Sequence, residues 1–305
     1  MFKTLTDKLQ FPEGPIAMAD GSIVLVEIRR GTLSRVMPDG EIQVIADLGG
    51  GPNGAAIGPD GHCYVCNNGG FNWTDDEHGS RPIMQADNYT GGRIERVNLE
   101  TGAVERLYDE AAGVPLKGPN DIVFDKQGGF WFTDLGKRRP EDMDNGGVFY
   151  ATVDGQHIER AIFPVLTPNG VGLSPDERRL YVAETQSGRL WAFDLEAPGR
   201  ISKHPFPSPH GGHLVAGMAG FQLFDSLAVD SAGNICVATL MNGGITTISP
   251  DGGAIDHLAM PDIYTTNICF GGNDLQTAYL TLSSSGRLVD MPWPTPGLPL
   301  NFLNE

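Results

Sequence analysis

The sequence of 305 residues predicts an all-β protein, a six-bladed β-propeller. A pattern of short apolar runs recurs six times, and most copies hold four such runs separated by tight turns. No segment has the apolar period of an amphipathic helix. Four strands in a repeat of about 40 to 50 residues are typical of a propeller blade. We therefore expect a single domain over residues 1–305.

The six copies share an opening phrase. A polar residue beside Pro or Gly precedes an apolar run, a Gly/Asp turn and a second apolar run, as in FPEGPIAMADGSIVLVEI and TPNGVGLSPDERRLYVAE. These runs are rich in β-branched and aromatic residues, which favour strands. The opening polar residues lie 40 to 67 residues apart and are Glu13, Asn53, Asn120, Asn169, Asp225 and Asn267.

The two ends of the chain predict how the ring closes. The last copy stops after its third run, because PWPTPGLPLNFLNE is too rich in proline to pair inside a sheet. The segment FKTLTDKLQ precedes the first copy and belongs to no blade of its own. We expect it to pair as the outer strand of the last blade, which leaves no open edge between first and last blades.

Composition excludes several classes of partner. The formal net charge of -17 opposes binding to nucleic acid and to anionic membrane surfaces. No apolar stretch approaches the roughly 18 residues of a membrane span. The start of the chain has no apolar signal core, so a cytoplasmic location is expected. Cys63, Cys66, Cys236 and Cys269 lie in apolar runs and are expected to be small buried side chains.

The opening residues predict a functional site. The first strand of each blade lines the axial channel, so the six polar residues should form a ring at one mouth. For Asn53 and Asn169, each followed by Gly, a plain role in a turn is also open. If Glu13 and Asp225 are buried together, they need a compensating cation. Carboxylate and amide oxygens favour Ca²⁺, with Mg²⁺, Mn²⁺ and Zn²⁺ as alternatives.

Two long connections, residues 67–92 and 134–147, should open on the same mouth and form the walls of a substrate site. Phe71, Trp73 and Tyr89 in the first connection either form a lid or only hold their own loop in place.

The second connection carries Lys137, Arg138 and Arg139, the chain's basic cluster. These residues either bind a substrate carboxylate or are ordinary surface charges. His210 and His213, in the crossing over residues 207–222, offer two metal ligands without a third, and their role is open. There is no serine-nucleophile elbow, phosphate-binding loop or HExxH motif.

Four segments together resemble the senescence-marker-protein/gluconolactonase family, which includes regucalcin-like proteins and bacterial sugar lactonases. They are FPEGP with Glu13, GPNDIVFDKQGGFWFTD with Asn120 and Asp121, TPNGVGLSPDERRLYVAET with Asn169, and FDSLAVDSAGNICVA with Asp225. The resemblance covers essentially the whole chain. It implies a six-bladed propeller that hydrolyses a lactone with one divalent cation.

By this resemblance Glu13, Asn169 and Asp225 are metal ligands, and Asn120 is a ligand or a substrate contact beside the ion. Two departures leave the choice of lactone open: Pro119 stands where the sugar lactonases often have arginine, and Ser226 where they commonly have glycine.

The implied substrate is a small lactone, contacted by Asn53 and Asn120. Asp225 is the expected general base, with Asp121 as the alternative or as a brace between strands. The rival hypothesis is a propeller that keeps a structural metal and binds a small molecule or protein at the same mouth without catalysis. The sequence leaves the oligomeric state open.

Overall fold

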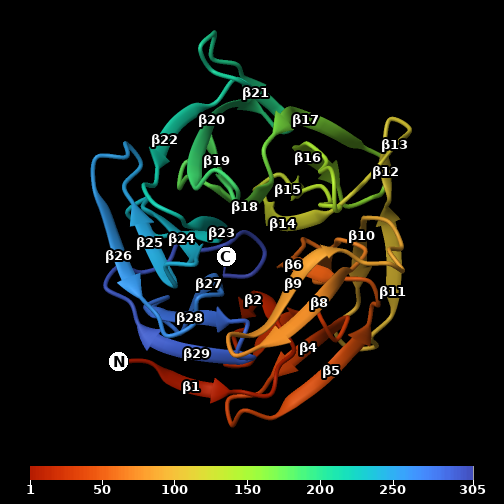
Figure 1. The fold of residues 1–305 in the computed structure, drawn as a ribbon, viewed down its shortest axis with the longest axis vertical. Coiled ribbons are helices and arrows are strands. Elements are labelled where there is room, and N and C mark those ends of the chain that lie inside the picture. Colours follow the sequence, from red (N-terminus) through yellow and green to blue (C-terminus); the bar gives the residue numbers. More distant parts are fainter. Residues whose placement is uncertain (305) are drawn as a thin grey trace.

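A computed structural model describes residues 1–304, which form six small antiparallel sheets around a central axis (Figure 1). Each sheet is one blade, so the predicted six-bladed propeller is confirmed. Within residues 1–304 there is no α-helix, and accordingly none long and apolar enough to cross a membrane.

The first three blades run outward from the axis in chain order. Blade one consists of β2 (Pro12–Ala17), β3 (Ile23–Glu27), β4 (Thr32–Val36) and β5 (Ile42–Asp47). Blade two consists of β6 (Pro52–Ile57), β7 (Cys63–Asn67), β10 (Arg93–Val97) and β11 (Val104–Tyr108). Blade three consists of β14 (Pro119–Phe124), β15 (Gly129–Asp134), β16 (Gly146–Thr152) and β17 (Ile158–Val165). Two hairpins lie outside these blades: β8 (Phe71–Asp76) with β9 (Gly79–Gln85), and β12 (Glu110–Ala111) with β13 (Val114–Pro115).

The other three blades complete the ring. Blade four consists of β18 (Pro168–Leu173), β19 (Arg179–Glu184) and β20 (Arg189–Ala197), with an outer strand split into β21 (Arg200–Ser202) and β22 (His213–Gly217). Blade five consists of β23 (Leu223–Val229), β24 (Ile235–Leu240), β25 (Gly244–Ile248) and β26 (Ile255–Ala259). Blade six consists of β27 (Thr265–Gly271), β28 (Thr277–Leu282), β29 (Arg287–Pro292) and β1 (Lys3–Thr6).

The N-terminal strand closes the ring, as the sequence predicts. Strand β1 pairs antiparallel with β29, with Thr4 opposite Val289. It therefore covers the edge that the proline-rich last segment leaves unpaired.

The core is divided among the blade interfaces. In the described part of the chain, six clusters of buried hydrophobic residues each join two adjacent blades. One cluster places Leu25 of blade one against Leu288 of blade six, so the closing interface is packed like the others. The four cysteines are buried and free, as expected.

The C-terminal segment covers the end of the channel where the inner strands finish (Figure 1). The Leu298 amide donates to the Val229 carbonyl oxygen (3.0 Å), and Asn301 Nδ2 donates to the Phe124 carbonyl oxygen (3.0 Å). A cavity of about 160 Å³ lies between this segment and the inner strands. The opposite end, where the inner strands begin, is the mouth that carries the polar ring.

Candidate active site at the channel mouth

A β-bulge marks the start of every inner strand. The pairing register shifts between Glu13 and Ile16, Pro52 and Ala55, Pro119 and Ile122, Pro168 and Val171, Phe224 and Leu227, and Thr265 and Asn267. A bulge re-aims side chains that the pleat would otherwise direct to a sheet face. Each of the six ring residues lies within or beside one of these bulges, five of them buried and Asp225 half-buried.

Glu13 is held from two sides. Its Oε2 accepts a hydrogen bond from Asn267 Nδ2 (2.6 Å) and one from the Gly14 amide (2.6 Å). Gly14 has φ +53, and a Cβ there would lie 2.8 Å from the Asn53 carbonyl oxygen and from the Ala55 amide. Glycine is therefore required beside Glu13, both for its backbone conformation and for the close approach of blade two.

Two amide oxygens at the mouth lack a partner. Asn169 Nδ2 donates to Thr185 Oγ1 (3.1 Å), which leaves Asn169 Oδ1 as the free end of the amide. Asn169 Oδ1 and Asn120 Oδ1 are buried and, among residues 1–304, accept no hydrogen bond. An unsatisfied buried acceptor costs about 1–3 kcal/mol. Binding of a cation by these oxygens would remove that cost.

Carboxylates at the mouth repel one another. Burial and the nearby Asp225 raise the pKa of Glu13 well above its ordinary value. Burial, together with the charge of Asp121, raises the pKa of Asp225 to about 7, against the opposing effect of the Asn169 side chain. An excess of negative charge with free amide oxygens is the environment that a divalent cation with oxygen ligands requires.

Asp121 lies below the ring and braces the blades. Its Oδ1 accepts from the Ile122 amide (3.0 Å) and its Oδ2 from the Val171 amide of blade four (3.2 Å). Burial raises its pKa to about 7 in spite of these bonds. Both oxygens are thus already engaged by backbone donors.

The two Asn-Gly pairs of the polar ring, which begin at Asn53 and Asn169, do not form turns. Asn53 lies in β6 and Asn169 in β18, so the alternative of a turn role for them is wrong. A Cβ on Gly170 would lie 2.7 Å from the Asp225 carbonyl oxygen and from the Leu227 amide. This glycine allows close packing of neighbouring inner strands, which is a different requirement from a turn.

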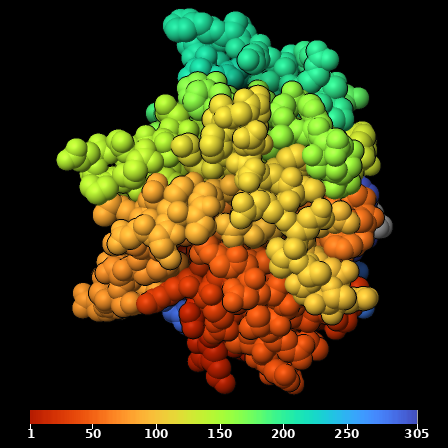
Figure 2. Space-filling model, turned by 90° about the vertical axis from the view of Figure 1, so that its right-hand side faces the viewer, coloured from red at the N-terminus to blue at the C-terminus, as the bar shows by residue number. Residues whose placement is uncertain are grey.

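The β8–β9 hairpin extends from blade two across the first blade toward blade six (Figure 1). The Ser80 amide donates to the Ser284 carbonyl oxygen of blade six (3.0 Å), and Arg29 of blade one pairs with Asp75. In Figure 2 the orange atoms of this part of the chain project from the left side of the molecule. Asp75 and Ser80 face each other near the tip of the hairpin, so the tip is anchored to blades one and six.

The aromatic residues of this insertion lie at two places. The Trp73 ring packs against Phe11, two residues before Glu13, with ring centroids 5.1 Å apart. Phe71 and Tyr89 instead lie beside the Lys137 ammonium, whose Nζ is 3.9 Å and 5.3 Å from their ring centroids.

For Lys137, the alternative of an ordinary surface charge is wrong. It is buried, and its Nζ donates to Asn68 Oδ1 (3.0 Å) and to the Gly70 carbonyl oxygen (2.9 Å). Burial lowers its pKa to about 7. Its ammonium holds the base of the blade-two insertion with two of its three donors. Of the other two, Arg139 pairs with Asp144 and Arg138 is exposed.

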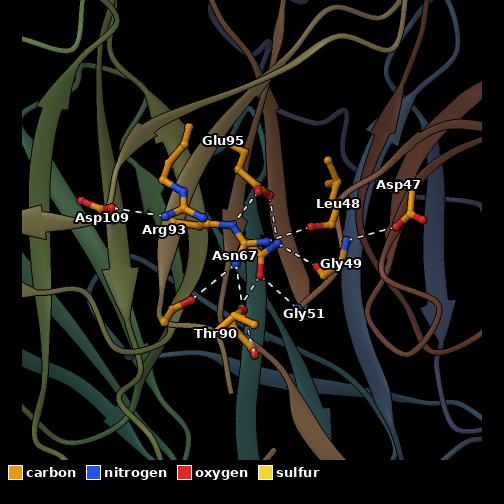
Figure 3. A network of polar contacts seen from close by, with 12 residues as sticks. Asp47, Leu48, Gly49, Gly51, Asn67, Thr90, Arg93, Glu95 and Asp109 are labelled. Carbon is orange, nitrogen blue, oxygen red and sulfur yellow. Dashed lines mark hydrogen bonds and ion pairs between the residues drawn. The ribbon is translucent and has the colours of Figure 1, made fainter. Parts of the chain in front are cut away.

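A buried polar network fixes the base of the same insertion (Figure 3). Arg93 Nε donates to Glu95 Oε1 (2.6 Å), and Asn67 Nδ2 donates to Glu95 Oε2 (2.9 Å). Arg93 Nη2 also reaches the Leu48 carbonyl oxygen (2.8 Å), and Asn67 Oδ1 accepts from the Gly51 amide (2.9 Å). The network joins blade two to the segment that leads into Asn53.

Sequence reasoning missed two residues at the mouth. Burial raises the pKa of Tyr264, and the charge of Asp225 adds to the increase, so the phenol lies within electrostatic reach of that carboxylate. Arg81, on the hairpin, pairs with Asp76 and lies near Tyr264. Tyr264 immediately precedes the inner strand β27, and this position could have indicated a residue at the mouth. Arg81 could not be predicted in this way, because nothing in the sequence shows how far the hairpin extends.

The two histidines of the blade-four crossing occupy different places in blade four. The His210 side chain is buried against Trp191, with ring centroids 4.5 Å apart. His213 begins β22, on the outer part of blade four.

Comparison with protein families supports the resemblance noted from the sequence. Residues 11–284 match the family model described as SMP-30/Gluconolactonase/LRE-like region. A gluconolactonase of Zymomonas mobilis subsp. mobilis is 27% identical over 306 residues, covering 92% of this chain and 78% of its own. A lactonase drp35 of Staphylococcus saprophyticus is 30% identical over 251 residues, covering 82% of this chain and 69% of its own.

Solved structures show the same fold. A regucalcin of Agrobacterium tumefaciens, described as a calcium-binding protein, superposes with a TM-score of 0.76 at 17% identity, covering 100% of this chain and 98% of the other.

Proposed function

Because the chain belongs to the SMP-30/gluconolactonase/LRE-like family, we propose that its channel mouth hydrolyses a small lactone with the help of one divalent cation. The observation that carries the proposal is the pair of buried, unpartnered oxygens, Asn120 Oδ1 and Asn169 Oδ1, beside the crowded carboxylates of Glu13 and Asp225. The relatives named as lactonases supply the class of substrate.

Glu13, Asn169 and Asp225 are the proposed ligands, with Asn120 as a fourth ligand or a substrate contact. All four side chains offer oxygen, and the ring contains neither Cys nor His, so the donor set favours Ca²⁺ over a softer metal. Mg²⁺, Mn²⁺ and Zn²⁺ are the alternatives. A bound ion of this kind polarises a carbonyl group and stabilises an oxyanion.

The chain's own residues supply the proton transfer. We assign the general base to Asp225, because its half-buried carboxylate lies at the mouth beside the Asn169 side chain and can accept a proton from attacking water there. Asp121 is the second choice, since both its oxygens already accept hydrogen bonds from backbone amides.

Residues around the mouth provide the proposed walls of the substrate site. Trp73 forms the apolar wall above Glu13, and Asn53 and Asn120 contact the substrate from the ring. Phe71, Tyr89 and Lys137 support that wall from beneath, and the exposed Arg138 stands at its edge. Tyr264 joins the set because it lies near Asp225.

Proton release from a panel of lactones tests the proposal. Aldonolactones, aliphatic lactones and aromatic lactones are each assayed with Ca²⁺ and with excess chelator. We expect turnover of at least one class that chelation abolishes and added Ca²⁺ restores. A protein that binds Ca²⁺ yet hydrolyses none of the three classes would instead be the non-catalytic, metal-stabilised propeller.

A further inference from the structure

Blade four has a feature that the channel site does not use. Its outer strand is interrupted. Strand β21 pairs with the C-terminal half of β20, and β22 pairs with the N-terminal half. Residues 203–212 form a loop between β21 and β22. In Figure 1 this loop projects beyond the rim at the top of the ring. His204 lies at the start of the loop and His213 directly after its end, while Asp194 lies opposite them on β20.

These three side chains converge on one point. His204 Nε2 lies 2.9 Å from Asp194 Oδ2, and His213 Nε2 lies 3.3 Å from the same oxygen. One ligand atom from each residue can be chosen so that all three lie within 4.8 Å of one another. The two imidazole ring centroids are 3.4 Å apart, so both histidines approach the carboxylate from the same side.

The two nitrogen–oxygen distances, 2.9 and 3.3 Å, are near the spacing of ligands around a small metal ion. Ligand atoms about 2.1 Å from a tetrahedral Zn²⁺ lie roughly 3.4 Å from one another. Two imidazole nitrogens and one carboxylate oxygen are a donor set for Zn²⁺ and similar transition metals, unlike the all-oxygen set at the channel mouth. The site is half-exposed, with side-chain exposures of 34% for Asp194, 32% for His204 and 45% for His213, so ions can reach it and water can complete the coordination.

We propose that Asp194, His204 and His213 bind one Zn²⁺ ion, which clips the two halves of the outer strand of blade four together across the loop. The loop is already anchored at one point, where His210 packs against Trp191 and Phe193. A metal bridging the two ends of the loop closes it, which restricts its movement. Arg179 Nε donates to Asp194 Oδ1 (3.1 Å) and leaves Oδ2 facing the histidines.

Calorimetric titration of ZnCl₂ tests the proposal, using the 305-residue chain loaded with Ca²⁺ to occupy the channel site. The double variant His204→Ala/His213→Ala removes two of the three ligands. His157→Ala is the matched control, because His157 is also an exposed histidine near a carboxylate, Glu159, but lies outside the cluster. We expect one site in the wild type and in His157→Ala whose affinity falls at least tenfold in the double variant. Equal stoichiometry and affinity in wild type and double variant would overturn the proposal.

Limited proteolysis supplies a second readout. Trypsin can cut after the exposed Lys203, at the start of the loop. Zn²⁺ should slow this cut in the wild type and leave its rate unchanged in the double variant. Equal rates with and without Zn²⁺ in the wild type would contradict the clip. Zn²⁺ at the channel site would affect both proteins alike, so the comparison isolates blade four, and it is independent of whether the protein hydrolyses lactones.

Discussion

Each ring residue depends on its neighbour in sequence. Gly14 lets Glu13 turn toward the axis without a clash against blade two, and Gly170 does the same for Asn169 against blade five. The sequence predicted the six polar positions because they recur in register. It could not separate Asn-Gly in a turn from Asn-Gly in a bulge, since both need a residue without a Cβ.

Asp225 and Asp121 make a decisive pair of variants. Asp225→Asn keeps the shape of the side chain but removes the proposed base, so we expect kcat to fall by about 10²–10⁴-fold with little change in the melting temperature. Asp121→Asn weakens the brace to Val171, so we expect a lower melting temperature and retained turnover in the folded protein. Steady-state assays and thermal melts on both variants provide the check. A fully active Asp225→Asn enzyme beside an inactive, stable Asp121→Asn enzyme would exchange the two roles.

The elements around the mouth were only partly predictable. The long connections and their aromatic residues stand out in the sequence, and so does the closing role of the first strand. The position of Lys137 does not, because its partners Asn68 and Gly70 are 69 and 67 residues away in the chain. The sequence also does not indicate that Asp194 lies beside His204 and His213.

The hairpin should affect substrate binding more than stability. Trp73 packs on Phe11 at the mouth but lies outside the six interblade clusters among the described residues. We expect Trp73→Ala to raise KM several-fold with a small effect on kcat, because a wall residue contributes to binding in the ground and transition states alike. The exposed Ile83 of β9 offers the control variant Ile83→Ala, which should leave KM unchanged. Unchanged KM in Trp73→Ala would exclude the tryptophan as a substrate contact.

Ring closure by β1 should contribute to the stability of the propeller. Deleting residues 1–9 removes a strand from blade six together with Leu9, which is buried in the cluster between blades six and one. Burying a leucine side chain alone is worth about 1.5–3 kcal/mol. We therefore expect a lower midpoint in urea and a lower melting temperature, with Lys8→Ala, an exposed position outside β1, as the neutral control. A truncated protein as stable as the full chain would show that the ring closes without this strand.

For the whole molecule, the channel makes stability depend on pH and metal together. Without metal, Asp225 and Asp121 have folded pKa values of about 7, above their unfolded values of about 3.9. A raised carboxyl pKa contributes stability that is present below the unfolded pKa and is lost as pH rises through the folded pKa. The metal-free protein should therefore lose stability between about pH 4 and pH 7.

Added Ca²⁺ should reverse this loss, because a bound cation compensates the ionised carboxylates. Thermal melts at pH 5 and pH 8, with chelator and with Ca²⁺, measure the effect. We expect the rise in melting temperature on adding Ca²⁺ to be larger at pH 8. A rise of equal size at both pH values would argue against buried carboxylates as the ligands.

Anomalous scattering from crystals soaked with Mn²⁺ tests the central claim most directly, because it locates the ion without reference to activity. We predict a strong peak at the channel mouth, within coordination distance of Glu13, Asn169 and Asp225, that vanishes in crystals of Glu13→Gln. A mouth without a peak, or a peak there that survives the loss of Glu13, would contradict the metal centre on which the proposed hydrolysis depends.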